Sequence, residues 1–253
     1  MDTQTRDLTW TPTHVLGAER ESRWLILCDH ATNRVPDFVN GGDLGIAQDD
    51  MARHIAYDVG ASGVAIRLAE KLGAPVVLSN FSRLVIDPNR GEDDPTLVMR
   101  LYDGTLIPAN RHVTEAQVRE RLERCYRPYH ETVANMAARQ SDTVIISVHS
   151  FTQQFRGRQV RPWHTGLLFA DDARLSHPLI DLLHREPGMI VGVNEPYSGH
   201  LKGDTIDRHA IETGRQNTLI EIRNDLITDD AGQVVWADRF ARLLPEALAQ
   251  AEA

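Results

Sequence analysis

Short apolar runs recur along the chain, and stretches with helical spacing separate many of them. The runs are rich in Val, Ile and Leu and are continuous rather than alternating, which is typical of strands covered on both faces of a sheet. They predict strands at seven places: residues 24–28, 75–79, 84–86, 143–148, 166–169, 189–193 and 218–222.

The helical stretches have recognisable starts. Thr114 and Gln117 form a capping-box pattern that opens a long helix. Pro128 is expected to kink or break that helix, because it lacks an N–H and its ring crowds the preceding turn. Apolar spacing predicts three further helices, at residues 50–59, at 61–72 and in a C-terminal segment from 240 to 248.

Strands that alternate with helices predict an α/β fold with a mainly parallel sheet and helices on both faces. The length of 253 residues, without a repeat, a low-complexity tract or a convincing linker, predicts one domain over residues 1–253. Two polar segments, 87–112 and 194–214, are long for loops, and long ordered loops in compact domains are often functional.

Charge and cysteine content restrict the partners. A net charge of −9 argues against a nucleic-acid binder, and it means that an anionic ligand needs its own local Arg or Lys. Cys28 and Cys125 are expected to be buried free thiols. The N-terminus lacks the pattern of a signal peptide, and no apolar run approaches the roughly 20 residues of a membrane span. These features predict a cytoplasmic protein without a membrane partner.

Reactive side chains stand where predicted strands end. Asp29 and His30 follow the strand at 24–28, and His149 follows the strand at 143–148. Ligands in open α/β sheets bind beyond the carboxyl ends of the strands. A single histidine there is more often structural, but two imidazoles with a carboxylate are the ligand set of many catalytic zinc sites. Zn²⁺ is the expected metal, with iron, cobalt or manganese as alternatives.

Glu221 and the segment after residue 86 offer further chemistry. Glu221 interrupts an apolar strand, either as a partner for Arg223 or as a carboxylate that moves protons for a metal-activated water. Arg90 offers a planar guanidinium that matches both oxygens of a carboxylate, and Asn89 adds a neutral donor. The alternative is an ordinary turn, which the sequence Asp-Pro-Asn also favours.

Six segments in order, "CDHATNRVP", "HIAYDVGA", "SRLVIDPNR", "YRPYH", "HSF" and "IEIRNDLI", resemble the N-formylglutamate amidohydrolase family. The matches extend from Leu25 to Ile227. That family is similar to zinc carboxypeptidases and aspartoacylase-type deacylases. The resemblance therefore implies a three-layer α/β/α sandwich with a mixed, mainly parallel sheet around a zinc ion.

The resemblance also implies roles for single residues. His30 and His149 match metal ligands, and Glu221 matches the general base. The implied substrate-binding residues are Asn89, Arg90, Arg83 and His209. Arg208 falls in a loop that would hold an oxyanion or a second carboxylate, with a solvated loop charge as the alternative.

One departure from the related peptidases concerns the third metal ligand. Asn33 stands where they have a glutamate ligand, so another carboxylate is needed. Asp50 and Asp58 are candidates, since with His54 they share one face of the predicted helix at 50–59. Asp50 is favoured because it lies at the helix start, with an ordinary N-cap as the alternative. Asp29 is expected to orient a neighbouring imidazole or to cap a loop.

These features predict a metal-dependent amidohydrolase that removes a small acyl group from an N-acyl acidic amino acid such as N-formylglutamate. A carboxypeptidase-like enzyme or another N-acyl amino acid hydrolase is the first alternative. A non-enzymatic binding protein on the same scaffold is the second.

Overall fold

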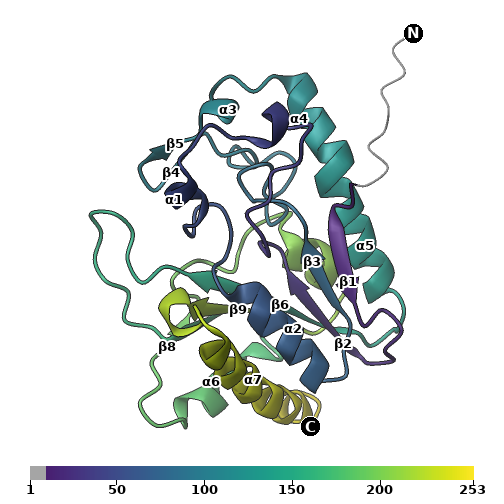
Figure 1. Ribbon diagram of the computed structural model, residues 1–253. Coiled ribbons are helices and arrows are strands. Elements are labelled where there is room, and N and C mark those ends of the chain that lie inside the picture. Colours follow the sequence, from purple (N-terminus) through teal and green to yellow (C-terminus); the bar gives the residue numbers. More distant parts are fainter. Residues whose placement is uncertain (1–9) are drawn as a thin grey trace.

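The computed structural model describes residues 10–253 and contains a mixed seven-stranded sheet (Figure 1). Its four central strands are parallel: β3 (Val76–Ser79), β2 (Trp24–Cys28), β6 (Val144–Phe151) and β9 (Asn217–Arg223). On one side β1 (Thr13–Leu16) pairs antiparallel with β3. On the other, β7 (Thr165–Leu168) pairs antiparallel with β9 and parallel with β8 (Val191–Val193). The carboxyl ends of β2, β6 and β9 therefore share one edge.

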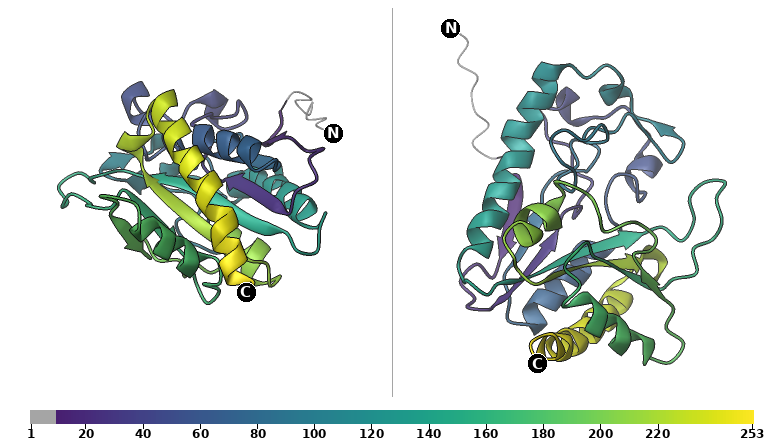
Figure 2. Two further views of the ribbon diagram at one scale, coloured as in Figure 1. Left: turned by 90° about the horizontal axis from the view of Figure 1, so that it is seen from below. Right: turned by 180° about the vertical axis from the view of Figure 1, so that it is seen from behind.

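Helices cover both faces of this sheet, as the three-layer prediction requires (Figure 2). One face packs against α2 (Ala61–Lys71), α6 (Ser176–His184) and α7 (Asp230–Ala251). The other packs against α5 (Arg127–Ala137). Ile146 and Ile220 point to the first face, whereas Ile145 and Leu219 point to the second. By the same alternation, Asp29, His149 and Glu221 belong to the α5 face.

Short elements lie in the connections: η1 (Asn40–Gly42), α1 (Gln48–Met51), the β4 (Leu101–Tyr102) and β5 (Thr105–Leu106) hairpin, α3 (Pro108–Arg111), α4 (Glu115–Arg121), η2 (Leu122–Tyr126), η3 (Asp207–Ile211) and η4 (Asn224–Leu226). The hairpin and β1 were not predicted from the sequence. The segment predicted as a loop at 87–112 contains the β4–β5 hairpin and α3. The one at 194–214 contains η3.

The capping box is confirmed, since Thr114 and Gln117 exchange hydrogen bonds at the start of α4. The regular α-helix is interrupted just before Pro128, in agreement with the prediction. It ends as α4 at Arg121, the π-helical stretch η2 follows, and α5 begins at Arg127 with Pro128 in its first turn. The Arg124 carbonyl, which would accept from residue 128 in a regular α-helix, accepts from Trp10 Nε1 at 3.0 Å.

Two of the predicted elements are wrong. Residues 84–86 form a buried turn, in which Asn110 donates to the Leu84 carbonyl and Arg121 to the Val85 carbonyl, both side chains replacing a strand partner. Residues 50–59 are not a helix, because α1 ends at Met51 and turns follow. The Ala56 carbonyl, for example, accepts from the Ser82 hydroxyl instead of from a helical N–H. Apolar content alone does not distinguish buried turns of this kind from regular elements.

A glycine fixes the end of this irregular stretch. Gly60 has φ of +80° and is the N-cap of α2. A Cβ on Gly60 would lie 2.1 Å from the Ile227 carbonyl oxygen, so only glycine fits there.

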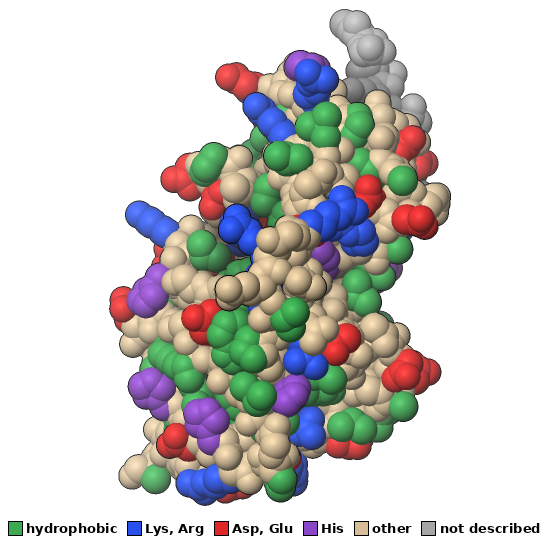
Figure 3. Space-filling view, turned by 90° about the vertical axis from the view of Figure 1, so that its left-hand side faces the viewer, with side chains coloured by type: hydrophobic (Ala, Val, Ile, Leu, Met, Phe, Trp, Pro, Cys, Tyr) green, Lys and Arg blue, Asp and Glu red, His purple; other side chains and the backbone are tan. Residues whose placement is uncertain are grey.

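Cys28 and Cys125 are buried and free, as predicted. None of the helices within residues 10–253 has both the length and the apolar content to cross a bilayer. Basic, acidic and hydrophobic side chains are interspersed on the face drawn in Figure 3.

A buried histidine pair joins α5 to η3. His130 Nε2 donates to the Pro88 carbonyl at 3.0 Å, so its Nδ1 accepts from His209 Nε2 at 2.9 Å. Burial, with the positive charge of Arg208, lowers the pKa of His130 to about 3 and that of His209 to about 4. Both rings are therefore neutral near pH 7, and the pair holds the chain at Pro88 next to Asn89 and Arg90.

The pair predicts a loss of stability in mild acid. Its histidines have a pKa below the ordinary value of 6.5, so their contribution is complete above pH 6.5 and falls as the pH drops toward 4. The free energy of unfolding should therefore decrease when the pH is lowered from about 7.5 to about 5. In His209→Gln this decrease is expected to be about 1 to 2 kcal/mol smaller than in the wild type. Chemical denaturation of both proteins at the two pH values measures this difference. Equal losses in the two proteins would contradict the assignment.

Candidate metal centre

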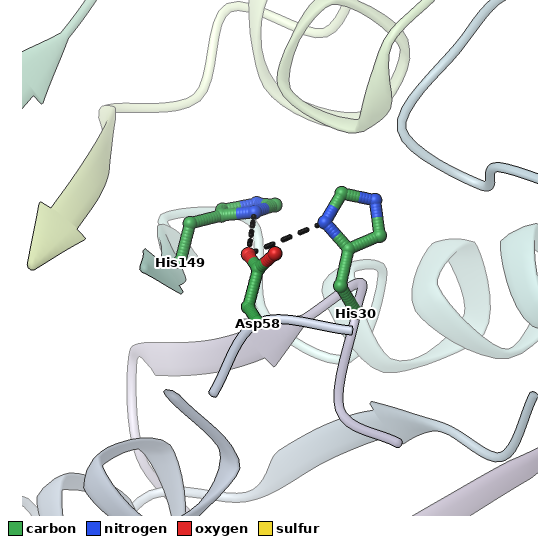
Figure 4. Close-up of side chains that lie close together, drawn as sticks. All are labelled: His30, Asp58 and His149. Carbon is green, nitrogen blue, oxygen red and sulfur yellow. Dashed lines mark hydrogen bonds and ion pairs between the residues drawn. The ribbon is translucent and has the colours of Figure 1, made fainter. Parts of the chain in front are cut away.

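Three segments that are distant in sequence converge at the carboxyl edge of the sheet: His30 after β2, His149 in β6 and Asp58 before α2 (Figure 4). His149 Nδ1 lies 2.9 Å from Asp58 Oδ2, and His30 Nδ1 lies 3.3 Å from the same oxygen. One donor atom from each residue falls within 4.8 Å of the others, and all three side chains are buried. Two imidazole nitrogens and a carboxylate oxygen are a ligand set that suits zinc.

Backbone contacts fix Asp58 in this place. Its N–H donates to the His30 carbonyl at 3.0 Å, and its Oδ2 accepts from the Ser150 N–H at 3.2 Å. The Ser150 hydroxyl also donates to the carbonyl of Val59 at 2.8 Å. The loop is thus tied to the ends of β2 and β6, which carry the two histidines.

The preference for Asp50 over Asp58 is corrected by this geometry. Asp50 is not part of the cluster and instead accepts from Arg53 Nη1 at 2.6 Å. Asn33 donates to the Met51 carbonyl at 2.8 Å. Because residues 50–59 do not form one helix, Asp50 and Asp58 share no helical face.

Two further carboxylates hold the far sides of the imidazole rings. His30 Nε2 lies 2.7 Å from Asp87 Oδ1, and His149 Nε2 lies 2.9 Å from Asp29 Oδ2. Such outer carboxylates fix which nitrogen of each ring faces a metal. The expectation that Asp29 orients a neighbouring imidazole is confirmed. Asp29 also accepts from three hydroxyl groups, those of Tyr129, Ser147 and Thr205.

The charge balance of the cluster favours a cation. Burial alone would raise the pKa of Asp29 and Asp58, but hydrogen bonds and charges from His30 and His149 outweigh it and hold both pKa values well below the usual range. Asp87 is ionised in the same way, chiefly because Arg83 donates to it at 2.7 Å and 3.1 Å. Burial alone would lower the pKa of His149, but Asp29 and Asp58 raise it well above its ordinary value, so a proton on that ring balances part of their charge. A divalent cation would displace this proton and take over the same role.

Glu221 lies beside His149, its direct partner across the β6–β9 register. The carboxyl is buried, and among residues 10–253 its Oε2 has no hydrogen-bond partner. Burial raises the pKa of Glu221 to about 7, although His149 opposes the shift. The alternative of a pair with Arg223 is not seen, because Arg223 binds Asp225 at 2.7 Å. A buried carboxyl without a partner and with a pKa near neutrality has the properties of a proton-transfer group.

A cavity of about 270 Å³ opens onto these groups. Its wall includes Arg83, Asn89 and Arg90. Arg90 donates to the Asn89 carbonyl at 2.7 Å and to Thr96 Oγ1 at 3.2 Å, and within the described chain no ion pair to a carboxylate involves it. Arg83 differs, because Asp87 and Asp58 already balance its charge.

Arg208 and His209 are not among the residues that line this cavity. Arg208 donates to the Tyr126 hydroxyl at 3.0 Å and its guanidinium lies over the Tyr126 ring. His209 faces His130. The structure thus gathers His30, His149, Glu221, Asn89, Arg90 and Arg83, and it leaves Asp50, Arg208 and His209 outside.

Sequence reasoning did not find two carboxylates of the site, Asp87 and Asp204. Asp87 begins the segment "DPNR" directly after the predicted strand at 84–86, the same kind of strand-end position that Asp29 has after the strand at 24–28. Asp204 lines the cavity from the segment before η3, and no pattern in the sequence distinguishes it from an ordinary loop acid.

Comparison with known proteins agrees with this architecture. A gene product of Agrobacterium tumefaciens with a known crystal structure is 32% identical, with a TM-score of 0.91 over 96% of this chain and 97% of that chain. The N-formylglutamate amidohydrolase from Ralstonia eutropha is 22% identical, with a TM-score of 0.72 over 95% of this chain and 97% of that chain. The search of curated protein sequences gave no significant match.

The family itself follows from a sequence model. The model described as N-formylglutamate amidohydrolase matches residues 22–228, which is most of the chain. The six ordered motifs and the α/β fold agree with it. The chain therefore belongs to the N-formylglutamate amidohydrolase family and is a hydrolase that acts on amide bonds.

Proposed function

We propose that this protein is a metal-dependent amidohydrolase that removes a small acyl group from the amino nitrogen of an N-acyl amino acid. The observation that supports it most is the convergence of His30 Nδ1, His149 Nδ1 and Asp58 Oδ2 next to Glu221, whose Oε2 is unpartnered within the described chain. A binding protein without catalysis would not need a buried carboxyl without a partner at this place.

The residues present fit a divalent metal. The donor set is two imidazoles and a carboxylate, and each imidazole is oriented by its own outer carboxylate. Zn²⁺ is our preferred identity on ligand type. When bound, it would lower the pKa of a water toward about 7 and polarise the acyl carbonyl.

Glu221 is the proposed proton carrier. It takes a proton from the attacking water as oxygen joins the acyl carbon, and it gives that proton to the amine nitrogen as the C–N bond breaks. Burial raises the pKa of Glu221 above its ordinary value, which suits a carboxyl that has to accept a proton and then release it.

Arg90 and Asn89 are the proposed holders of the substrate α-carboxylate. Arg90 lines the cavity without a carboxylate partner among residues 10–253, and Asn89 is buried beside it. A guanidinium paired with a carboxylate fixes the orientation as well as the position of the substrate.

The size of the cavity favours a small substrate. About 270 Å³ lies just below the range of small-molecule sites, which span roughly 300 to 1,000 Å³. This size suits an N-acyl amino acid better than the polypeptide of a carboxypeptidase-like enzyme.

Glu221→Gln tests the proton-transfer role. The amide keeps the size of the side chain but cannot accept the proton of the water, so kcat is expected to fall by roughly 10²- to 10⁴-fold. Metal content, measured by elemental analysis, is expected to stay at the wild-type level. Glu246→Gln, an exposed change on α7, is the matched control and should keep full activity. Undiminished turnover in Glu221→Gln would refute the role.

Arg90→Ala tests carboxylate recognition. Loss of the charged hydrogen bonds is expected to raise KM by roughly 10- to 100-fold, with a smaller effect on kcat. The control is the corresponding N-acyl amino acid amide, which lacks the carboxylate. Wild type and variant should process that amide alike, and an equal loss on both substrates would contradict the assignment.

A further inference from the structure

The cavity offers one free positive charge. Of its two guanidinium groups, Arg83 is bound to Asp87 and Asp58, and Arg90 alone lacks a carboxylate partner within residues 10–253. Burial lowers the pKa of the His54 ring, also in the wall, to about 4, so that ring is neutral near pH 7. One substrate carboxylate can therefore be balanced, and a second would have no counter-charge there.

The wall on the β7 side of Glu221 is apolar. Leu219 lies two residues before Glu221 on the same face of β9, and it pairs with Leu168 of β7. Three further apolar or aromatic side chains, Ile206, Leu201 and Tyr197, also line the cavity.

Close packing on β7 holds the segment that carries Tyr197. A Cβ on Gly166 would lie 1.8 Å from the Glu195 carbonyl oxygen, so glycine lets this segment lie directly on the strand. Asn194 donates its N–H to the Leu167 carbonyl and accepts from the Phe169 N–H, both at 2.9 Å. The apolar wall is thus built by the sheet and is not a loosely covering loop.

One further cation, Arg161, is not among the residues that line the cavity. Arg161 donates to the Tyr197 hydroxyl at 3.2 Å and to the Thr152 carbonyl, and its guanidinium lies 4.1 Å from the centre of the Phe155 ring. Its position behind Tyr197 leaves the aromatic ring, and not the charge, facing the cavity.

Asp204 adds a carboxyl group to the same cavity. Its side chain is buried and accepts from the Asp207 N–H at 2.7 Å. Burial raises the pKa of Asp204 to about 7. In its ionised form this group repels an anion, and in its neutral form it supplies no positive charge.

From the single free guanidinium, the apolar wall and Asp204, we propose that the enzyme selects N-acyl amino acids with an uncharged, apolar side chain over dicarboxylates such as N-formylglutamate. This rests on the proposed function and narrows its substrate class. Burying a second carboxylate against Leu168 and Leu219 without a partner is unfavourable, whereas an aliphatic side chain gains from the same contact.

The test compares N-formyl-L-leucine, N-formyl-L-glutamine and N-formyl-L-glutamate as substrates of the metal-loaded wild-type enzyme. We expect kcat/KM for the leucine compound to exceed that for the glutamate compound by about 10-fold or more. Glutamine has the shape of glutamate without its charge, and it should fall between them. A preference for N-formylglutamate, or equal rates, would overturn the inference and leave the proposed function standing.

Calorimetric binding of the same compounds separates the two proposals if none is hydrolysed. Tighter binding of N-formylleucine than of N-formylglutamate would support the inference while the proposed function fails. Tighter binding of N-formylglutamate, or no binding of any compound, would overturn the inference.

Leu201→Arg supplies the missing cation at a half-buried position, where a long side chain is tolerated. It should shift the ratio of kcat/KM values toward N-formylglutamate by about 10-fold. Leu201→Gln, a polar change without charge, is the matched control and should leave the ratio close to that of the wild type. An unchanged ratio in a folded Leu201→Arg protein would count against the proposal.

Discussion

The site depends on one continuous chain of buried ionic hydrogen bonds. Acidic and basic side chains alternate along it in the order Asp29, His149, Asp58, His30, Asp87 and Arg83. The chain joins the ends of β2 and β6 to the loop before α2 and to the segment after residue 80. Any one of these charges would be costly to bury alone, so each is stable only while its neighbours are in place. This mutual dependence fixes the direction of both Nδ1 atoms.

The arrangement of the strands explains where this network of hydrogen bonds lies. Parallel strands bring Asp29, His149 and Glu221 to one edge and, by alternation, to one face of the sheet. The opposite face, packed against α2, α6 and α7, is mainly apolar in these strands, and its Thr218 is hydrogen-bonded to Ser176 of α6. The helices packed on one face of the sheet thus hold the strands rigid, and this rigidity positions the polar side chains on the other face.

Much of this could be predicted from the sequence, because strand cores and strand-end residues depend on local pattern. The seven apolar runs identified six of the sheet strands, and His30, His149 and Glu221 were found by their place on them. Asp58 was named but not preferred, since its place beside His30 and His149 depends on a tertiary turn that the helical spacing of residues 50–59 concealed. The run at 84–86 failed for the same reason, because side chains of Asn110 and Arg121 satisfy its backbone. Side-chain contacts between distant segments leave no periodic signal in a single sequence.

The position of a bound metal tests this account most directly. Crystals of the zinc-reconstituted protein, with diffraction recorded across the zinc absorption edge, would locate the ion without reference to activity. We expect one anomalous peak in contact with His30 Nδ1, His149 Nδ1 and Asp58, with Asp29 and Asp87 still bound to the opposite ring nitrogens. A peak at Asp50 or elsewhere on the chain, or no peak at full zinc occupancy in solution, would contradict it.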